Sequence, residues 1–391
     1  MPKRVGMEVS LAIGEAVMLA DVDVVAAYPI TPQTHIVEHI AELVANGELD
    51  ASYIPVESEH SAMSACLGSA AVGARTFTAT AGQGLELMHE VLFIAASMQL
   101  PMVMTVANRA LSAPLSVWGD HSDVMASRDT GWIQIFTENG QEVFDNVLCA
   151  FRIGEDKRVL LPVMVHLDGF HLSHMIEPIL IEDKEKVDKF LPKYDYPLPL
   201  DPKKPVSMGT FAPPVIYSES KKAQEVNLQK SKDVIVECWD EYAKIFGRQY
   251  KPVETYRAED AKTLLLTMGS YSETAMATID KMRDDGQSVG LVRLRLWRPF
   301  PTKELRQAVK NAETLVVFDR ALSLGGQAGP VCAEVRSALY NEAKKPKVAN
   351  IIGGLGGRDV TVAGFEEIIN KGIAMMEKDS GQEFEIYGVR E

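Results

Sequence analysis

Four short segments carry residue types suited to chemistry, and each follows an apolar run. In chain order they are Tyr28 to Pro32, Glu57 to His60, Ala81 to Gly84, and Asn108 with Arg109. Thr31 offers a hydroxyl, and Pro32 suits a first helical turn, so Thr31 is a predicted helix N-cap. Glu57 and Glu59 lie two residues apart, so in an extended chain both carboxylates would point to the same side.

The other two segments add a turn and a cation. Gly82 and Gly84 permit a close ligand approach, although the turn is too short for a Walker phosphate loop. Arg109 offers a guanidinium that can hold a carboxylate through two hydrogen bonds. Taken singly, the four segments are equally well explained as a helix cap, an acidic turn, a plain turn and a surface ion pair. Together they indicate a site for a 2-oxo acid and an organic cofactor.

Alternating strands and helices over residues 1–175 are predicted to bring these segments together. The predicted strands are 22–27, 52–56, 76–80, 102–107, 132–136 and 160–165, and the predicted helices are 36–45, 62–72, 85–98 and 143–153. Such alternation is typical of a mostly parallel sheet covered on both faces. Ligands bind such sheets beyond the carboxyl ends of the strands, so we expect the four segments at one crevice.

Beyond residue 180 the composition changes. Residues 180–214 contain a charged run and seven prolines, which predicts an extended connecting arm. An amphipathic helix is predicted at 221–248. A second α/β unit then follows, with strands 263–268, 288–294 and 314–319 and helices 273–281, 303–312 and 328–344. The turn at Gly269 and Ser270 is either an anion site or, with greater weight, a purely structural turn.

The composition excludes several classes of protein. The 391 residues include 40 Lys and Arg against 54 Asp and Glu, a net charge of −14 that argues against a nucleic-acid partner. No apolar run reaches the roughly 18 residues of a membrane helix, and we expect no signal peptide and a cytoplasmic location. The four scattered cysteines are predicted to be buried, reduced thiols. We expect no metal ligand in this chain.

The chain resembles the α subunits of the thiamine-diphosphate-dependent 2-oxoacid:ferredoxin oxidoreductases, in particular the pyruvate:ferredoxin oxidoreductases (pyruvate synthases). The matching segments are AAYPITPQT (26–34), IPVESEHSAMSA (54–65), TFTATAGQGLELMHE (76–90), ANRALSAP (107–114), WGDHSDVMASRDTGWIQ (118–134), LDGF (167–170), LWRPFP (296–301) and GLGGRD (354–359). The resemblance covers nearly the whole chain, in order and at matching spacing. It is therefore far more specific than any single motif.

The resemblance implies a fold and an activity. The fold is α/β, with a parallel-sheet domain similar to the pyrimidine-binding domain of thiamine enzymes at 1–180. A connecting arm and helix at 181–258 lead to a domain similar to the transketolase C-terminal domain at 259–391. The implied activity is the reversible, coenzyme A-dependent oxidative decarboxylation of pyruvate to acetyl-CoA and CO2, with electrons passed to ferredoxin, as in anaerobic metabolism.

The resemblance also implies roles for residues. Glu59 is expected to hydrogen-bond the aminopyrimidine ring of thiamine diphosphate, while Thr31 and Arg109 are expected to bind the substrate carboxylate. The further expected contacts are with the cofactor at Pro29, Ile30, Gly82 and Gln83, and with the substrate at Asn108. The glycines within 353–357 are expected to form a tight turn at a subunit contact.

Part of the expected machinery is missing from the sequence. The diphosphate half of a thiamine site resembles a G-D-G signature, but Gly119-Asp120 is followed by His121, and no glycine precedes Asp168-Gly169. The resemblance therefore implies separate β, γ and δ subunits. These would hold the diphosphate, Mg2+ and [4Fe-4S] clusters in a dimer of heterotetramers.

Three alternatives remain open. The first is the same chemistry on another 2-oxo acid, such as 2-oxoglutarate or a branched-chain acid, although YPITPQT and NRALSAP favour pyruvate. The second is a non-catalytic scaffold subunit, which the combination of Thr31, Glu59 and Arg109 argues against. The third, a self-sufficient transketolase-like enzyme, would need its own diphosphate signature.

Overall fold

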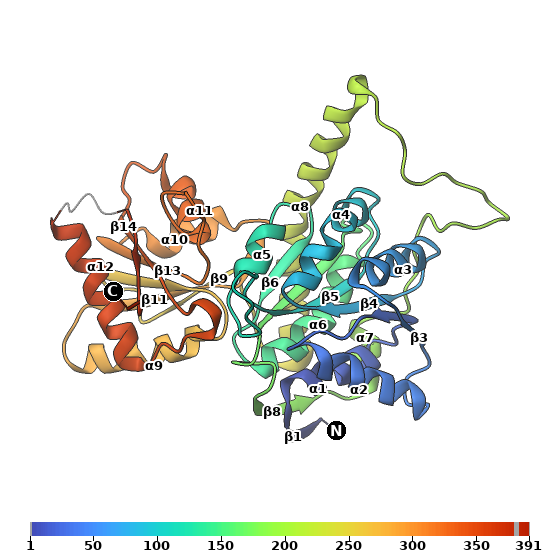
Figure 1. The fold of residues 1–391 in the computed structure, drawn as a ribbon, viewed down its shortest axis with the longest axis horizontal. Coiled ribbons are helices and arrows are strands. Elements are labelled where there is room, and N and C mark those ends of the chain that lie inside the picture. The colour runs from blue at the N-terminus through green and yellow to red at the C-terminus, as the bar shows by residue number, and fades with distance from the viewer. Residues whose placement is uncertain (1, 379–382, 391) are drawn as a thin grey trace.

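The computed structural model describes residues 2–378 and 383–390, which form two α/β halves lying side by side (Figure 1). The strands of the N-terminal sheet are β2 (Val24–Ala27), β3 (Ser52–Pro55), β4 (Thr76–Thr80), β5 (Val103–Asn108), β6 (Ile133–Phe136) and β7 (Val163–Asp168). They are parallel, in the order β6-β7-β5-β4-β2-β3. A strand of the C-terminal half, β12 (Leu296–Arg298), extends this sheet antiparallel to β6.

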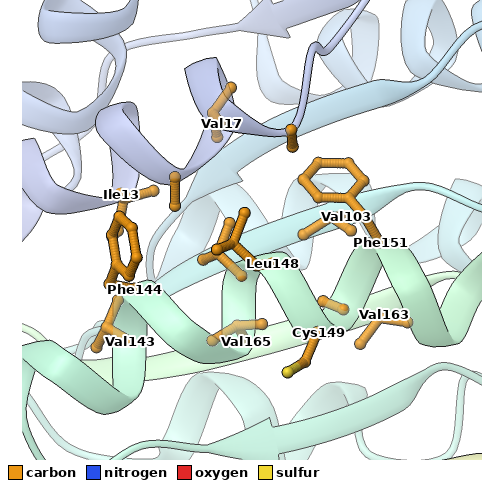
Figure 2. Close-up of a cluster of buried hydrophobic side chains, with 14 of the residues drawn as sticks. Ile13, Val17, Val103, Val143, Phe144, Leu148, Cys149, Phe151, Val163 and Val165 are labelled. Carbon is orange, nitrogen blue, oxygen red and sulfur yellow. The ribbon is translucent and has the colours of Figure 1, made fainter. Parts of the chain in front are cut away.

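Helices cover both faces of the N-terminal sheet. They are α1 (Val9–Leu19), α2 (Thr34–Ala45), α3 (Glu59–Ala71), α4 (Gln83–Ser97), α5 (Ser122–Ser127) and α6 (Gly140–Gly154). On one face, Ile13 of α1 and Leu148 of α6 share a buried cluster with Val103 (Figure 2). On the other, Met63 of α3 and helix α4 pack with Met104. Adjacent residues of one strand are thus buried on opposite faces, which is why the strands are apolar without interruption.

The segment between the two halves is more structured than predicted. Strand β8 (Ile176–Ile181) pairs antiparallel with β1 (Lys3–Glu8), an N-terminal strand that the sequence analysis did not predict. Residues 184–190 then form helix α7 (Lys184–Phe190), because burial of Val187 and Phe190 in the core outweighs the local charge. The extended arm is therefore limited to residues 191–213.

The long helix α8 (Pro214–Phe246) follows the arm and begins earlier than the predicted residue 221. Pro214 suits the first helical turn, where its missing N–H group is not needed. The later part of α8 is fixed on α6, where Trp239 Nε1 donates to Asn146 Oδ1 over 3.0 Å. Its first turns project away from the body of the molecule (Figure 1).

The C-terminal half is built on the sheet order β15-β14-β13-β10-β11-β9. Its strands are β9 (Val253–Tyr256), β10 (Thr263–Thr267), β11 (Val289–Leu294), β13 (Thr314–Asp319), β14 (Lys347–Ile352) and β15 (Glu385–Ile386). Its helices are α9 (Tyr271–Asp284), α10 (Thr302–Val309), α11 (Pro330–Leu339), the short 3-10 turn Leu355–Gly357 and α12 (Val362–Lys378). Helix α11 is shorter than the predicted 328–344, since Gly329 is its N-cap and Pro330 its first residue.

No helix among the described residues is both long and apolar enough to cross a membrane.

All four cysteines are buried and unpaired, as predicted.

Candidate active site

Glu59 is the first residue of α3 and follows β3 at the carboxyl edge of the sheet. The chain enters the helix at Ser58, whose hydroxyl oxygen accepts a hydrogen bond from the Ser61 N–H over 3.2 Å. This N-cap places Glu59 in the first helical turn, where the helix dipole favours a carboxylate. Glu59 is only 6% exposed, and none of the described residues donates a hydrogen bond to its carboxylate. A buried carboxylate without a donor is available to a ligand.

Glu57 does not share this position, so the prediction that both carboxylates point to the same side is wrong. The chain is extended at Ser58 but helical from Glu59 onward, and the turn separates the two side chains. Glu57 is exposed and accepts a hydrogen bond from the Ser61 hydroxyl over 2.6 Å. That bond lowers the pKa of the Glu57 carboxyl below its ordinary value.

Two glycines let Glu59 and Arg109 approach the turn that follows β4. Gly82 has φ +50° and ψ −121°, a conformation that residues with a Cβ avoid. A Cβ on Gly84 would lie 2.7 Å from Glu59 Oε1, and a Cβ on Gly82 would lie 3.0 Å from Arg109 Cδ. The glycine turn therefore brings a carboxylate and a guanidinium together at the carboxyl edge of the sheet, as the strand-end argument predicted.

Arg109, directly after β5, is held by backbone carbonyl groups. Its Nε donates to the carbonyl oxygen of Ser116 over 2.8 Å, and its Nη1 donates to the carbonyl oxygen of Thr31 over 3.0 Å. Burial lowers the pKa of the guanidinium from its ordinary value, an effect opposed by the nearby charges of Asp123 and Glu59. Arg109 is 7% exposed, and the Nη2 nitrogen of its guanidinium makes no hydrogen bond to a described residue. This nitrogen remains free to bind an acid.

Asp123, in the short helix α5, is a residue that the sequence analysis missed. Its Oδ2 accepts hydrogen bonds from the Gly82 N–H over 3.0 Å and the Arg109 N–H over 2.9 Å. Its Oδ1 accepts from Asn108 Nδ2 over 3.0 Å. Burial raises the pKa of Asp123 to about 7, although these hydrogen bonds oppose the rise. Asp123 thus joins the turn after β4 to the end of β5.

Asn108 lies behind Arg109 rather than on the crevice surface. Its side chain is fully buried, and its Nδ2 is within 3.4 Å of His166 Nδ1 as well as bonded to Asp123. The direct substrate contact expected for Asn108 is therefore unsupported by its position. The side chain instead positions Asp123.

The loop after β2 contacts Arg109 at the same edge of the sheet, but Thr31 is not the N-cap of α2. The helix begins at Thr34, and its N-cap residue is Gln33. The buried Gln33 side chain stabilises the preceding turn. Its Oε1 accepts a hydrogen bond from the Ile30 N–H over 3.2 Å, and its Nε2 donates one to the carbonyl oxygen of Ala79 over 2.8 Å. Thr31 is exposed, so its hydroxyl is accessible while its carbonyl binds Arg109. Of the expected cofactor contacts in this loop, Pro29 is exposed and Ile30 is half-buried.

A second buried carboxylate, Asp168, ends β7 at the junction of the two halves. His121 Nε2 lies 3.0 Å from Asp168 Oδ1, which also accepts a hydrogen bond from Arg320 NH1. The Ser270 N–H and hydroxyl donate to Oδ2 over 2.8 and 2.6 Å. Burial raises the pKa of Asp168, but the charge of Arg320 and the hydrogen bonds from His121 and Ser270 outweigh it and hold this pKa well below its usual range. The turn at Gly269 and Ser270 therefore does bind an anion, but the anion is Asp168 of the same chain.

The glycines expected at a subunit contact also meet this chain. The Gly357 N–H donates to the Gly119 oxygen over 2.7 Å, and a Cβ on Gly357 would lie 2.6 Å from Trp118 Cβ. A Cβ on Gly354 would lie 2.7 Å from the Tyr271 ring. Their small size allows the C-terminal half to contact the loop that carries Trp118.

The side chains at this edge of the sheet fit the aminopyrimidine ring that the sequence resemblance implies. Besides the carboxylate of Glu59, Thr80 Oγ1 and Gln83 Oε1 are buried without a partner among the described residues. A heterocycle with both donors and acceptors would satisfy such groups. The free Nη2 of Arg109 suits a carboxylate substrate at the same edge.

Comparisons with known proteins identify the family of this chain. A family profile for the thiamine-diphosphate-binding domain of pyruvate flavodoxin/ferredoxin oxidoreductases matches residues 15–239. A profile for core domain II of pyruvate:ferredoxin oxidoreductases matches residues 261–365. The two matches cover both halves of the chain.

Individual relatives are similar over most of their length. Pyruvate synthase subunit PorA of Methanocaldococcus jannaschii is 51% identical, with 92% of each chain covered. The PorA subunit of Pyrococcus furiosus is 48% identical over 94% of this chain and 93% of that protein. Ketoisovalerate oxidoreductase subunit VorA of Pyrococcus horikoshii is 45% identical over 91% of this chain and 90% of that protein.

Solved structures support the fold. A 2-oxoglutarate:ferredoxin oxidoreductase from Magnetococcus marinus matches with a TM-score of 0.72 at 19% identity, covering 94% of this chain and 64% of that chain. A split-gene transketolase matches with a TM-score of 0.54 at 12% identity, covering 95% of this chain and 99% of that chain. The predicted fold class and family resemblance are thus confirmed, and the chain belongs to the pyruvate flavodoxin/ferredoxin oxidoreductase family.

Proposed function

We propose that this chain is the catalytic α subunit of a pyruvate:ferredoxin oxidoreductase. The enzyme converts pyruvate and coenzyme A to acetyl-CoA and CO2, and it passes the electrons to ferredoxin. The observation that carries the proposal is the buried Glu59 carboxylate, which lacks a donor among the described residues and lies with Arg109 beside the glycine turn that follows β4. The PorA relatives support pyruvate as the substrate.

Thiamine diphosphate, when bound, supplies the nucleophilic carbon that allows a 2-oxo acid to lose CO2. The role of this chain is to bind and orient. The Glu59 carboxyl would share a proton with a ring nitrogen of the bound cofactor, and its low exposure of 6% would limit competition from water for that hydrogen bond. Gly82, Gln83, Pro29 and Ile30 would contact the bound cofactor.

Arg109 and Thr31 orient the substrate. The Nη2 nitrogen of Arg109 donates to the pyruvate carboxylate, and the exposed Thr31 hydroxyl adds a second hydrogen bond. Because that carboxylate leaves as CO2, the main contribution of Arg109 is positioning rather than charge stabilisation of the product. Asn108 acts indirectly, by holding Asp123 against the backbone of Gly82 and Arg109.

The rest of the machinery is assigned to partner subunits. A β subunit holds the diphosphate and Mg2+, and [4Fe-4S] clusters of partner subunits carry electrons to ferredoxin, with γ and δ subunits completing a dimer of heterotetramers. The relatives named as subunits support a multisubunit enzyme. The active site would then lie between this chain and the β subunit.

The test is an anaerobic assay of the isolated chain and of the complex that co-purifies with it. Pyruvate, thiamine diphosphate, Mg2+ and coenzyme A are supplied, and reduction of ferredoxin or a viologen dye is followed. We expect reduction only with the complex. Inactivity of the intact complex on every 2-oxo acid tried would favour the scaffold alternative.

The VorA relative gives a specific reason to test a second substrate class, the branched-chain 2-oxo acids. Values of kcat/KM for pyruvate, 2-oxoglutarate and 3-methyl-2-oxobutanoate, measured on the same complex, decide between them. A preference for the branched acid would reassign the substrate while keeping the chemistry.

A further inference from the structure

Three potential metal ligands lie together outside the candidate active site. They are Glu8 at the end of β1, His35 in the first turn of α2, and His174 in the loop between β7 and β8. One ligand atom from each lies within 4.8 Å of the other two, and His35 Nδ1 is 2.7 Å from Glu8 Oε1. The sequence concealed this cluster, because no two of its members are close in the chain.

The donor set has a definite chemical preference. Two imidazoles and one carboxylate bind Zn2+ and similar divalent transition metals, with ligand distances of about 2.0–2.2 Å. In a tetrahedral site such ligand atoms lie roughly 3.3 Å apart. The His35–Glu8 distance of 2.7 Å and the upper limit of 4.8 Å for the three ligand atoms lie on either side of this value. A fourth position would remain for water.

The surroundings of His174 favour its role as a ligand. Its Nδ1 lies 2.7 Å from Ser173 Oγ, and donation to that oxygen leaves the lone pair on Nε2 for a metal. The His174 ring packs between the rings of His35 and Phe170, with both centroid distances 4.6 Å.

We propose that Glu8, His35 and His174 bind a divalent transition-metal ion of the Zn2+ type. The ion would tie β1, the start of α2 and the β7–β8 loop to one another. That loop also packs against the segment carrying Thr31, since a Cβ on Gly169 would lie 2.7 Å from Pro32 Cγ. The metal is thus a structural cross-link behind the crevice, and its binding does not depend on the proposed function.

The test uses the full-length chain without an affinity tag. Zn2+ binding is measured by calorimetry, and Co2+ is added as a spectroscopic probe whose visible absorption reports tetrahedral coordination. We expect one site per chain and a higher melting temperature with Zn2+. His35→Gln and His174→Gln should each weaken binding by about 100-fold or more, since even loss of an outer-shell partner weakens metal sites by roughly 10–100-fold.

The matched control is His89→Gln. His89 also faces a carboxylate, with Nδ1 4.0 Å from Glu86 Oε2, but it belongs to no such cluster among the described residues. This variant should bind Zn2+ with unchanged affinity. Should His174→Gln impair folding, His35→Gln decides alone, because the His35 side chain is 43% exposed and its loss leaves the core intact. Absence of Zn2+ binding by the wild-type chain, or equal affinity in wild type, His35→Gln and His89→Gln, would overturn the proposal.

Discussion

Glu59 and Asp168 are both buried carboxylates at the carboxyl edge of one sheet, yet their surroundings differ completely. Asp168 is 1% exposed and is bonded by a guanidinium, an imidazole and two donors of Ser270. Glu59 is nearly as buried, but no described residue donates to its carboxylate. Asp168 joins the two halves of the chain, whereas the Glu59 carboxylate is free to bind a ligand.

The contrast distinguishes structure from function on physical grounds. Burying a charge costs free energy unless the charge is paired. Arg320 supplies the opposite charge for Asp168, and His121 and Ser270 add hydrogen bonds. Glu59 has no hydrogen-bond donor among the described residues and interacts only electrostatically with Arg109, so its carboxylate can accept a hydrogen bond from a bound group. Substitutions at the two positions should therefore have opposite consequences.

The largest expected effect is on the activity of Glu59→Gln. Removal of the carboxyl proton should lower kcat by roughly 10²–10⁴-fold, the usual contribution of a positioned acid or base. Stability should be unchanged or slightly higher, because a neutral amide is less costly to bury than an unpaired carboxylate. Steady-state kinetics of the complex and urea unfolding of the chain give the two values. Near wild-type turnover would end the assignment of Glu59.

Asp168→Asn should show the reverse. Breaking a buried ion pair leaves Arg320 uncompensated and should lower the free energy of unfolding by about 3–5 kcal/mol. The midpoint of urea unfolding, at an unchanged m value, measures this loss. A stability within error of wild type would mean that the junction cluster does not hold the halves together.

Arg109→Lys keeps the charge but loses the planar fork held by Ser116 and Thr31. The KM for pyruvate should rise by about 10–100-fold, since a hydrogen bond between charged groups contributes roughly 1.5–3 kcal/mol. The effect on kcat should be smaller. A fall in kcat at constant KM would instead place Arg109 in the chemical step.

Asp123→Asn should have a smaller, pH-dependent effect. As the pH falls through about 7, Asp123 takes up a proton, and the hydrogen bonds that it accepts from the Gly82 and Arg109 N–H groups weaken. The KM of the wild type should therefore rise. The variant is neutral at every pH, so its KM should be about 2–10-fold higher than that of the wild type at pH 8 and lack this rise. A parallel pH profile in both proteins would exclude Asp123 as the titrating group.

The same substitution predicts a stability difference whose sign follows from linkage. The native pKa of Asp123, about 7, lies above the unfolded value of about 4. Its favourable contribution to the free energy of unfolding is therefore fully present below pH 4 and is lost as the pH rises through about 7. Relative to Asp123→Asn, the wild type should therefore lose stability between pH 5 and 8. Urea midpoints at the two pH values test this.

The smallest effect is expected for Glu57→Gln, the matched control for Glu59. Glu57 is exposed and bonds only the Ser61 hydroxyl among described residues. Both kcat and KM should stay within about twofold of wild type, as is usual for surface substitutions. A large loss of activity would mean that Glu57 meets a partner subunit or the cofactor.

The sequence predicted the fold of the N-terminal half well, because uninterrupted apolar strands such as 102–107 alternate with helical segments. It missed β1, whose residues pair with β8 far along the chain and carry no strong strand pattern. Helix α7 was missed because its charges hide the burial of Val187 and Phe190. Local signals failed wherever a distant contact decided the structure.

The candidate site was predicted in part for the same reason. Glu59, Gly82 and Arg109 could be found because each follows a predicted strand, and parallel strand ends share one edge. Asp123 follows no predicted strand, so only its contacts reveal it.

By itself, the sequence determined the α/β class, the family resemblance and the residue types at the strand ends, because periodicity and local motifs are properties of neighbouring residues. Only the tertiary structure decided which carboxylates are paired. Glu59 is unpartnered among described residues, Glu57 faces solvent, and Asp168 is bonded to groups from the other half of the chain. Pairing depends on donors that are distant in sequence, and it is the folded chain that brings them together or keeps them away.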